Sequence, residues 1–119
     1  MAGRPGPSQR FERMAESRRD TSETYARALR HPRRRDILCM AVAGAKAVSP
    51  GGVSGRLDLP HNSLAYHFGV LVEGGVLRLR FARPQRGTVE NFYKPVPEAL
   101  AHPIVLELLE ENGLGQQQR

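Results

Sequence analysis

The chain has 119 residues, of which 39% are hydrophobic, and it carries one cysteine. This length suits a single domain with short appendages. One cysteine excludes an internal disulfide and any metal site built from two thiolates. No stretch approaches the ~20 consecutive apolar residues of a membrane span, and the Arg-rich start lacks the apolar core of a secretory signal, so we expect a cytoplasmic protein.

The charge is strongly basic and unevenly distributed. Residues 1–96 hold 17 basic and 8 acidic residues, a net charge of +9, whereas residues 97–112 hold four Glu and no basic residue. Most of the basic residues are Arg, whose planar guanidinium suits phosphate and guanine. Nucleic acid is therefore the expected partner class; the alternative is an ordinary solvated basic surface.

The N-terminal part of the chain predicts a disordered arm and then helices. The arm over residues 1–9 is rich in Gly and Pro, a weak helical pattern over 10–19 contains Phe11 and Met14, and a further helix is expected over about 21–30. The next helix starts at Pro32 and runs to about residue 43. Because it is apolar nearly all round, we expect it to be buried.

Two more helices are indicated by their end signals. Ser49 is an N-cap residue and Pro50 suits a first helical position, which predicts a helix through about residue 57. The following helix is expected over about residues 61–73, and the pair Gly74-Gly75 suits its C-terminal cap.

The periodicity then changes from that of a helix to that of a strand. Over residues 76–81, alternation predicts one face with Leu77, Leu79 and Phe81 and the opposite face with Arg78 and Arg80. A turn is expected over residues 82–87 and a second strand over 88–96. Residues 97–112 predict a C-terminal helical segment with a break at a proline, and 113–119 a disordered tail.

Together these elements predict an α+β fold, mainly α with a small β-hairpin. Two helices joined by a tight turn and followed by a hairpin form a winged helix-turn-helix, here a domain over residues 10–96 flanked by terminal helices. The helix over 61–73 places Leu64, Phe68, Leu71 and Val72 on one stripe, which we expect to face the core. The opposite side carries polar and aromatic side chains suited to base edges in a major groove.

Three segments of the chain resemble the ArsR-type family of bacterial winged-helix transcriptional regulators. They are ALRHPRRRDIL, then VSPGGVSGRLDLPHNSLAYHFGVLVEGGVLRLR, then RGTVENFYKP, within about residues 24–96. The resemblance implies a homodimer that binds a near-palindromic operator in double-stranded DNA, most often as a repressor.

By matching position, the resemblance assigns DNA contacts to the helix over 61–73 and to the hairpin. At Ala65 and Gly69, where family members often carry a polar or basic residue, this sequence has a small one. His67 is expected near phosphate or as a brace for the helix. The full expected set is His61, Asn62, Ser63, Tyr66, His67, Arg78, Arg80, Arg83 and Arg86.

The C-terminal segment carries more apolar side chains than one face of a short helix hides. We expect them to form a dimer contact, the alternative being the core of a single chain. The residues are Ile104, Val105, Leu106, Leu108 and Leu109. Whether the N-terminal helix joins this interface is open.

For several other residues the sequence leaves more than one role open. The run Arg33–Arg35 opposes the helix dipole, so we expect phosphate or a carboxylate such as Asp36 or Asp58 nearby. The alternative to a phosphate contact is a solvated or intramolecular role. Cys39 suits a packed hydrophobe or, alternatively, a redox switch. His31 is expected to pack locally. The helix that precedes the one over 61–73 holds no metal ligand. The remaining possibility for a metal site is His102 together with the C-terminal glutamates.

No catalytic signature, cofactor motif or zinc-ligand spacing is present in the sequence, so we expect neither an enzyme nor a cofactor. Two alternatives to a sequence-specific regulator remain. One is a winged-helix module for protein contact, and the other is a non-specific architectural DNA binder. The Gly-rich helix over 50–57 and the small Ala65 and Gly69 keep the second of these open.

Overall fold

The computed structural model describes residues 20–44 and 46–112, and it confirms the predicted fold class. The predicted N-terminal arm, the helix over 10–19 and the C-terminal tail lie outside the described residues. Residues 20–28 are helical, and the elements that follow are α2 (Pro32–Ala43), α3 (Pro50–Leu57), α4 (His61–Glu73), β1 (Leu77–Gln85), β2 (Thr88–Pro95), α5 (Pro97–Leu100) and α6 (Pro103–Glu111).

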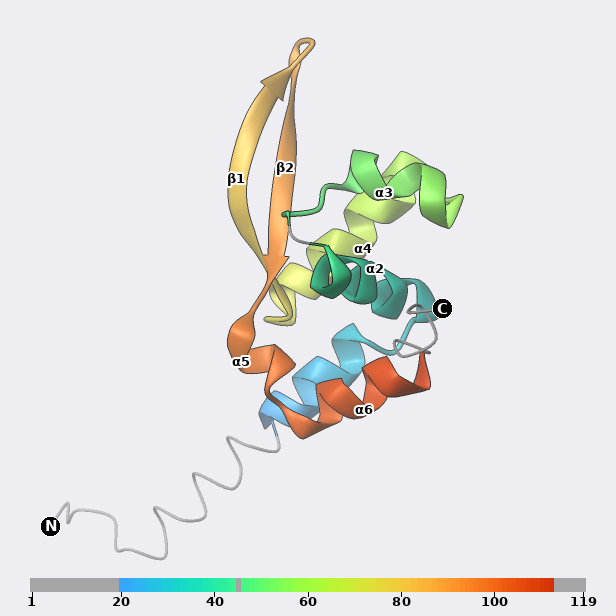
Figure 1. Ribbon diagram of the computed structural model, residues 1–119, viewed down its shortest axis with the longest axis vertical. Helices are drawn as coiled ribbons and strands as arrows, with labels where there is room; N and C mark the ends of the chain where they lie inside the picture. Colours follow the sequence, from blue (N-terminus) through green and yellow to red (C-terminus); the bar gives the residue numbers. More distant parts are fainter. Residues whose placement is uncertain (1–19, 45, 113–119) are drawn as a thin grey trace, which may run out of the picture.

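The helices form the body of the molecule and the hairpin projects from it (Figure 1). α2, α3 and α4 pack together, and the hairpin extends past them. At the other end, the helical segment 20–28 lies beside α6. Contacts of His102 join the two: its ring meets Tyr25 edge to face at 5.2 Å, and its Nε2 is 3.2 Å from the hydroxyl of Ser22. The two terminal segments thus pack together within one chain.

The core lies where α2, α4, α6 and the start of β1 meet. Its largest fully buried side chains include Phe68, Leu64 and Leu71 of α4, as the helical stripe predicted. Ile37 and Leu38 of α2 are also fully buried, so the prediction of a buried α2 is confirmed. The prediction that Val72, the fourth residue of the stripe, faces the core is wrong: it lies at the end of α4 and is 37% exposed.

Local sequence signals explain the ends of the central helices. The Ser49 hydroxyl accepts a hydrogen bond from the backbone N–H of Gly52 at 3.1 Å and caps α3. At the end of α4, Gly75 has a φ of +76°, and the N–H of Val76 donates to the carbonyl of Leu71. This is a Schellman cap, as the glycine pair predicted.

Gly74 is needed for a second reason. A Cβ at this position would lie 2.5 Å from the Cβ of Ala28, on the helical segment 20–28. The close approach of this segment to the end of α4 therefore requires a glycine.

The hairpin differs from its prediction in two ways. Its strands run to Gln85 and from Thr88, so the expected six-residue turn is wrong. The turn is only Arg86-Gly87, and both residues have positive φ, 48° and 81°. Positive φ at both central residues is the type I′ geometry that matches the twist of a hairpin.

The second difference is a β-bulge. Leu79 pairs with Tyr93, but Phe81 pairs with Phe92, so β1 has one extra residue at Arg80. The bulge moves Phe81 to the face opposite Leu79, and the predicted apolar face of three residues is wrong. Only Leu77 is buried in β1.

α6 packs on α2, and this changes the set of residues expected at a dimer contact. Val105 and Leu109 are 0% and 2% exposed within one chain, because they point into its own core. Their assignment to a dimer contact is therefore wrong, and the intramolecular alternative holds for them. Leu106 is 48% exposed, whereas Ile104 and Leu108 are partly buried.

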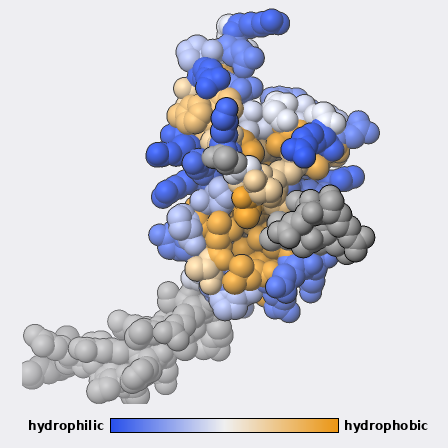
Figure 2. Space-filling model, in the orientation of Figure 1, coloured by the Kyte–Doolittle hydropathy of each residue, from blue (hydrophilic) through white to orange (hydrophobic). Residues whose placement is uncertain are grey.

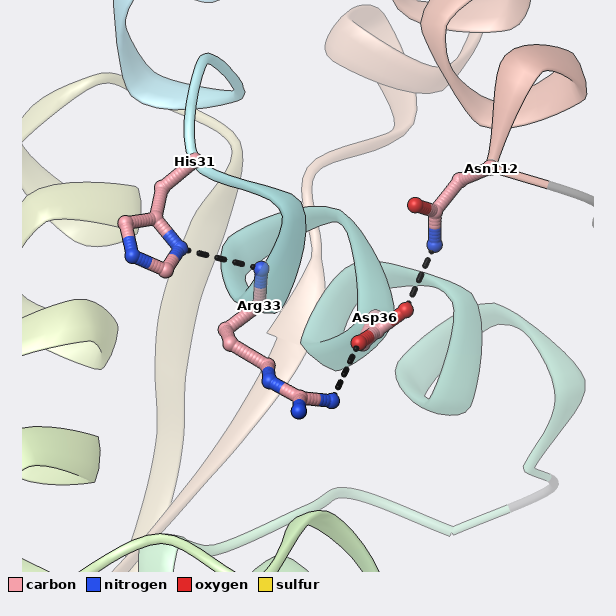
Figure 3. Close-up of polar contacts among 4 residues, drawn as sticks. All are labelled: His31, Arg33, Asp36 and Asn112. Atoms are coloured by element: carbon pink, nitrogen blue, oxygen red, sulfur yellow. Dashed lines mark hydrogen bonds and ion pairs between the residues drawn. The ribbon is translucent and has the colours of Figure 1, made fainter.

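A polar contact fastens the end of α6 to α2 (Figure 3). The side-chain amide of Asn112 donates to Asp36 Oδ1 at 2.6 Å, and Arg33 pairs with the other oxygen of Asp36 at 3.3 Å. Asp36 is thus held from both sides, and His31 caps the same helix through the backbone N–H of Arg33.

No helix within residues 20–44 and 46–112 is long and apolar enough to cross a membrane.

Candidate nucleic-acid interface

The outer face of α4 is free of packing. Tyr66 is 67% exposed, and His61, Asn62, Ala65 and Gly69 are exposed on the same helix. The small residues at positions 65 and 69 have little side chain to cover the backbone, and space around Gly69 is open. α4 therefore presents a narrow polar and aromatic strip with Tyr66 standing out from it, which suits insertion into a groove.

The first turn of α4 leaves backbone donors available. Its N-cap is Pro60, which provides no side-chain hydrogen bond. The side-chain carbonyl oxygen of Asn62 accepts a hydrogen bond from the backbone N–H of Ser63 at 2.9 Å, and the side-chain amide nitrogen takes no part in this bond. Free N–H groups at a helix N-terminus favour phosphate. Ser63 itself is only partly exposed.

His67 differs from the other expected contact residues because it is 8% exposed. The guanidinium of Arg34 donates to its Nδ1 at 3.3 Å, and its ring lies 4.6 Å from that of His31. Burial, together with the nearby His31 and Arg34, lowers the pKa of His67 below its usual value. Of the two expected positions, these contacts fit the brace: His67 joins α4 to the start of α2.

The arginine run at the start of α2 is used within the chain. The Nε of Arg34 donates to the carbonyl of Ala28 at 2.6 Å, and Arg35 donates to the carbonyls of Leu29 and Arg30 at 2.8 and 3.0 Å. These are carbonyls at the end of the preceding helical segment, where cations are favoured. The intramolecular alternative is therefore confirmed for Arg34 and Arg35, and Arg33 pairs with Asp36.

The hairpin arginines are exposed, in contrast. Arg78, Arg80, Arg83 and Arg86 all lie at the surface. The guanidinium of Arg83 sits 5.2 Å from the ring centre of Phe92 and 5.8 Å from that of Phe81. Arg86 occupies the tip of the hairpin, the point furthest from the helices (Figure 1). The tip thus carries positive charge beyond the body of the molecule.

Cys39 lies in the core, with 0% of its surface exposed. Burial raises the pKa of its thiol, with a smaller contribution from the nearby Asp36, which disfavours the reactive thiolate. The packed role is therefore the one the structure supports. Within the described ranges, no three His, Cys, Asp or Glu side chains come together as a metal site.

Several solved structures are similar to this chain. Reduced HlyU from Vibrio cholerae N16961 is 24% identical, covers 88% of this chain and 95% of its own, and has a TM-score of 0.56. The homodimeric winged helix-turn-helix DNA-binding domain of Mb0332 from Mycobacterium bovis, a possible ArsR-family transcriptional regulator, is 18% identical, covers 96% and 94%, and has a TM-score of 0.59. The chain has a winged helix-turn-helix fold.

A third structure, the transcriptional regulator HlyU from Vibrio vulnificus CMCP6, is 21% identical, covers 92% of this chain and 97% of its own, and has a TM-score of 0.54. No protein-family model matches the chain, and no curated protein matches it. In this winged helix-turn-helix fold, α3 and α4 form the helix-turn-helix, with α4 as the recognition helix, and the hairpin β1–β2 forms the wing.

Two features of this surface were missed by sequence reasoning. The first is the cluster of Phe81, Phe92 and Arg83 on one face of the wing, which the bulge creates; no glycine or proline at Arg80 marks that bulge. The second is the pairing of His67 with Arg34, residues 33 positions apart, for which the sequence holds no local signal.

Proposed function

We propose that this protein is a sequence-specific DNA-binding transcriptional regulator, in the repressor class, that binds an inverted-repeat operator as a homodimer. α4 would lie in the major groove, with His61, Asn62, Ser63 and Tyr66 near bases or adjacent backbone. The wing arginines, with Arg86 foremost, would contact phosphate or the minor groove. His67 would act by holding α4 in place.

The observation that carries this proposal is the outer face of α4. On a winged helix-turn-helix, an exposed helix face with one large aromatic side chain and two small residues is available for a groove. The positive charge of the wing lies beyond it. Solved structures with a similar fold include a DNA-binding domain and a protein described as a transcriptional regulator.

The experiment that tests the proposal is selection of bound fragments from a random duplex pool at about 150 mM salt, where non-specific binding is weakened. An inverted repeat with half-sites about one helical turn apart supports a dimeric regulator. Enrichment without a motif would instead support an architectural binder. No enrichment would favour a protein-contact module.

The dimer is tested at α6. Leu106 is the most exposed large apolar residue of this helix, and Figure 2 shows an apolar area on the body of the molecule below the hairpin. We expect Leu106→Glu to give a monomer by light scattering, because it places a charge in a desolvated contact. Leu79→Glu, at a 53% exposed apolar residue of the wing, is the matched control and should remain a dimer. A dimer that persists in Leu106→Glu would place the interface elsewhere.

A further inference from the structure

One face of the wing combines two aromatic rings, one of them exposed, with several cations. Phe81 and Phe92 stack across the two strands with ring centres 4.7 Å apart and planes 15° apart. Phe81 is 43% exposed, although an aromatic ring of this kind is usually buried. Arg78 and Lys94 form the neighbouring pair on the same face, and Arg83 lies over the rings.

This face points away from the recognition helix. Tyr93 contacts Phe68 of α4, with ring centres 5.2 Å apart, so the Tyr93 face of β2 is the one packed on α4. Phe92 is the next residue in the strand, and successive strand residues point to opposite faces. The stacked rings therefore lie on the side of the wing opposite α4. In Figure 2 the hairpin shows apolar side chains edged by hydrophilic ones.

Two adjoining hollows open on this side. One, of about 480 Å³, lies between the end of α2, α3 and Phe92, and is lined by apolar side chains including Met40, Val48 and Val53. The other, of about 500 Å³, lies over the stacked rings. Both are lined by Lys46, Ala47 and Phe92, so they adjoin, and we call the two together the depression. Each falls in the range of about 300–1,000 Å³ typical of small-ligand sites.

The charge of this depression has one sign. Lys46, Arg56, Arg80, Arg83 and Lys94 line it, and no Asp or Glu is among the described residues that do so. An apolar floor, the exposed ring of Phe81 beside the half-buried ring of Phe92, and a cationic rim are complementary to a ligand with an apolar planar body and an anionic group.

We propose that this depression, between the loop at residues 46–48, α3 and the outer face of the wing, binds a small planar organic anion, an aromatic ring system bearing a carboxylate or a similar acid. The ring would pack against Phe92 and Phe81, and the acid group would pair with Lys46 and Lys94. The site is separate from the outer face of α4, and the inference does not rest on the proposed DNA-binding function.

The test uses the full chain without DNA and 1-naphthoate as the probe. ¹⁵N-labelled protein is titrated, and amide shifts are followed by NMR while affinity is measured by calorimetry. We expect shifts centred on residues 46–48, 80–83 and 92. The neutral analogue 1-naphthalenemethanol should bind about tenfold more weakly, because it lacks the charge that the rim pairs with.

Variants separate the two halves of the site. Lys46→Gln with Lys94→Gln should weaken naphthoate binding about tenfold, and Phe81→Ala should do the same by removing an exposed ring. Both changes are at the surface, and NMR spectra report whether the fold is kept. Arg27→Gln with Arg30→Gln, which removes two exposed arginines near the other end of the molecule, is the matched control and should bind as the unaltered chain does.

Several outcomes would overturn the proposal. They are no shifts at millimolar naphthoate, shifts centred on α6, equal binding of the neutral analogue, or equal loss in the control variant. Displacement of naphthoate by equimolar inorganic phosphate would also overturn it, since a site for any small anion needs no rings.

Discussion

The arginines at the start of α2 and those of the wing have the same formal charge and opposite uses. Arg34 and Arg35 turn back onto carbonyls that end the preceding helical segment, with distances of 2.6 to 3.0 Å. Arg78 and Arg86 remain exposed on the hairpin. A basic run in a sequence therefore does not by itself identify a nucleic-acid contact; the acceptors within reach decide its use.

The first prediction tests the inward use of arginine and carries the largest expected effect. Arg34→Met keeps the apolar stem but removes the donors to Ala28 and His67. We expect the free energy of unfolding to fall by about 1.5–3 kcal/mol, because a charge-assisted hydrogen bond is lost and a carbonyl loses its partner. Urea denaturation measures this change.

The control is Arg30→Met, at an arginine that is exposed. It should change the free energy of unfolding by no more than about 0.5 kcal/mol. If Arg34→Met instead left stability unchanged and flattened the salt dependence of DNA binding, Arg34 would belong with the wing arginines.

The second prediction concerns Tyr66, a large side chain of α4 that is 67% exposed. Tyr66→Ala should weaken binding to the selected operator by about 1–3 kcal/mol and leave binding to random duplex nearly unchanged, because base contacts carry specificity. Fluorescence anisotropy with both duplexes measures the two affinities. An equal loss on both duplexes would contradict a base-reading role.

The third prediction concerns the tip of the wing. Arg86→Asn removes the charge but keeps the backbone, since Asn tolerates the φ of 48° found there. The slope of log affinity against log salt should become less steep by about 0.9, the contribution of one phosphate contact. Thermal denaturation should show no loss of stability; an unchanged salt slope would show that the tip stays off the DNA.

The helices were predictable from sequence because their signals are local. Ser49 caps α3 through its own hydroxyl, and Gly75 ends α4 because it adopts a positive φ. The strip on α4 that includes Tyr66 also followed from helical periodicity. These features depend on residues within one turn of one another.

The remaining features depend on contacts between distant segments. Val105 and Leu109 looked available for a partner, but α6 docks on α2 and buries them in its own chain. The bulge at Arg80 results from pairing with β2, so alternation along β1 alone gave the wrong face for Phe81. His67 showed the polarity of a phosphate ligand, and only the fold brings Arg34 to it.

The smallest predicted effect concerns His67, which is bonded to Arg34, one of the arginines used within the chain. Nδ1 of His67 accepts from Arg34, a residue that only donates, so the neutral ring fits the site and the protonated ring does not. The pKa of His67 is lowered in the folded chain by burial, then by His31 and Arg34, so the unfolded chain binds the proton more readily. The stabilisation is present above the ordinary His pKa and is lost as the pH falls through the lowered one.

We therefore expect the free energy of unfolding to decrease as the pH is lowered from 7 to 5, and to decrease less in His67→Gln, which cannot take up a proton. Urea denaturation across this range measures both. His61→Gln is the matched control, because it removes an exposed histidine of the same helix and leaves His67 and its bond to Arg34 in place. If the wild-type and His67→Gln curves ran parallel, proton uptake at His67 would not be coupled to folding, and the contact with Arg34 would tolerate the charged ring.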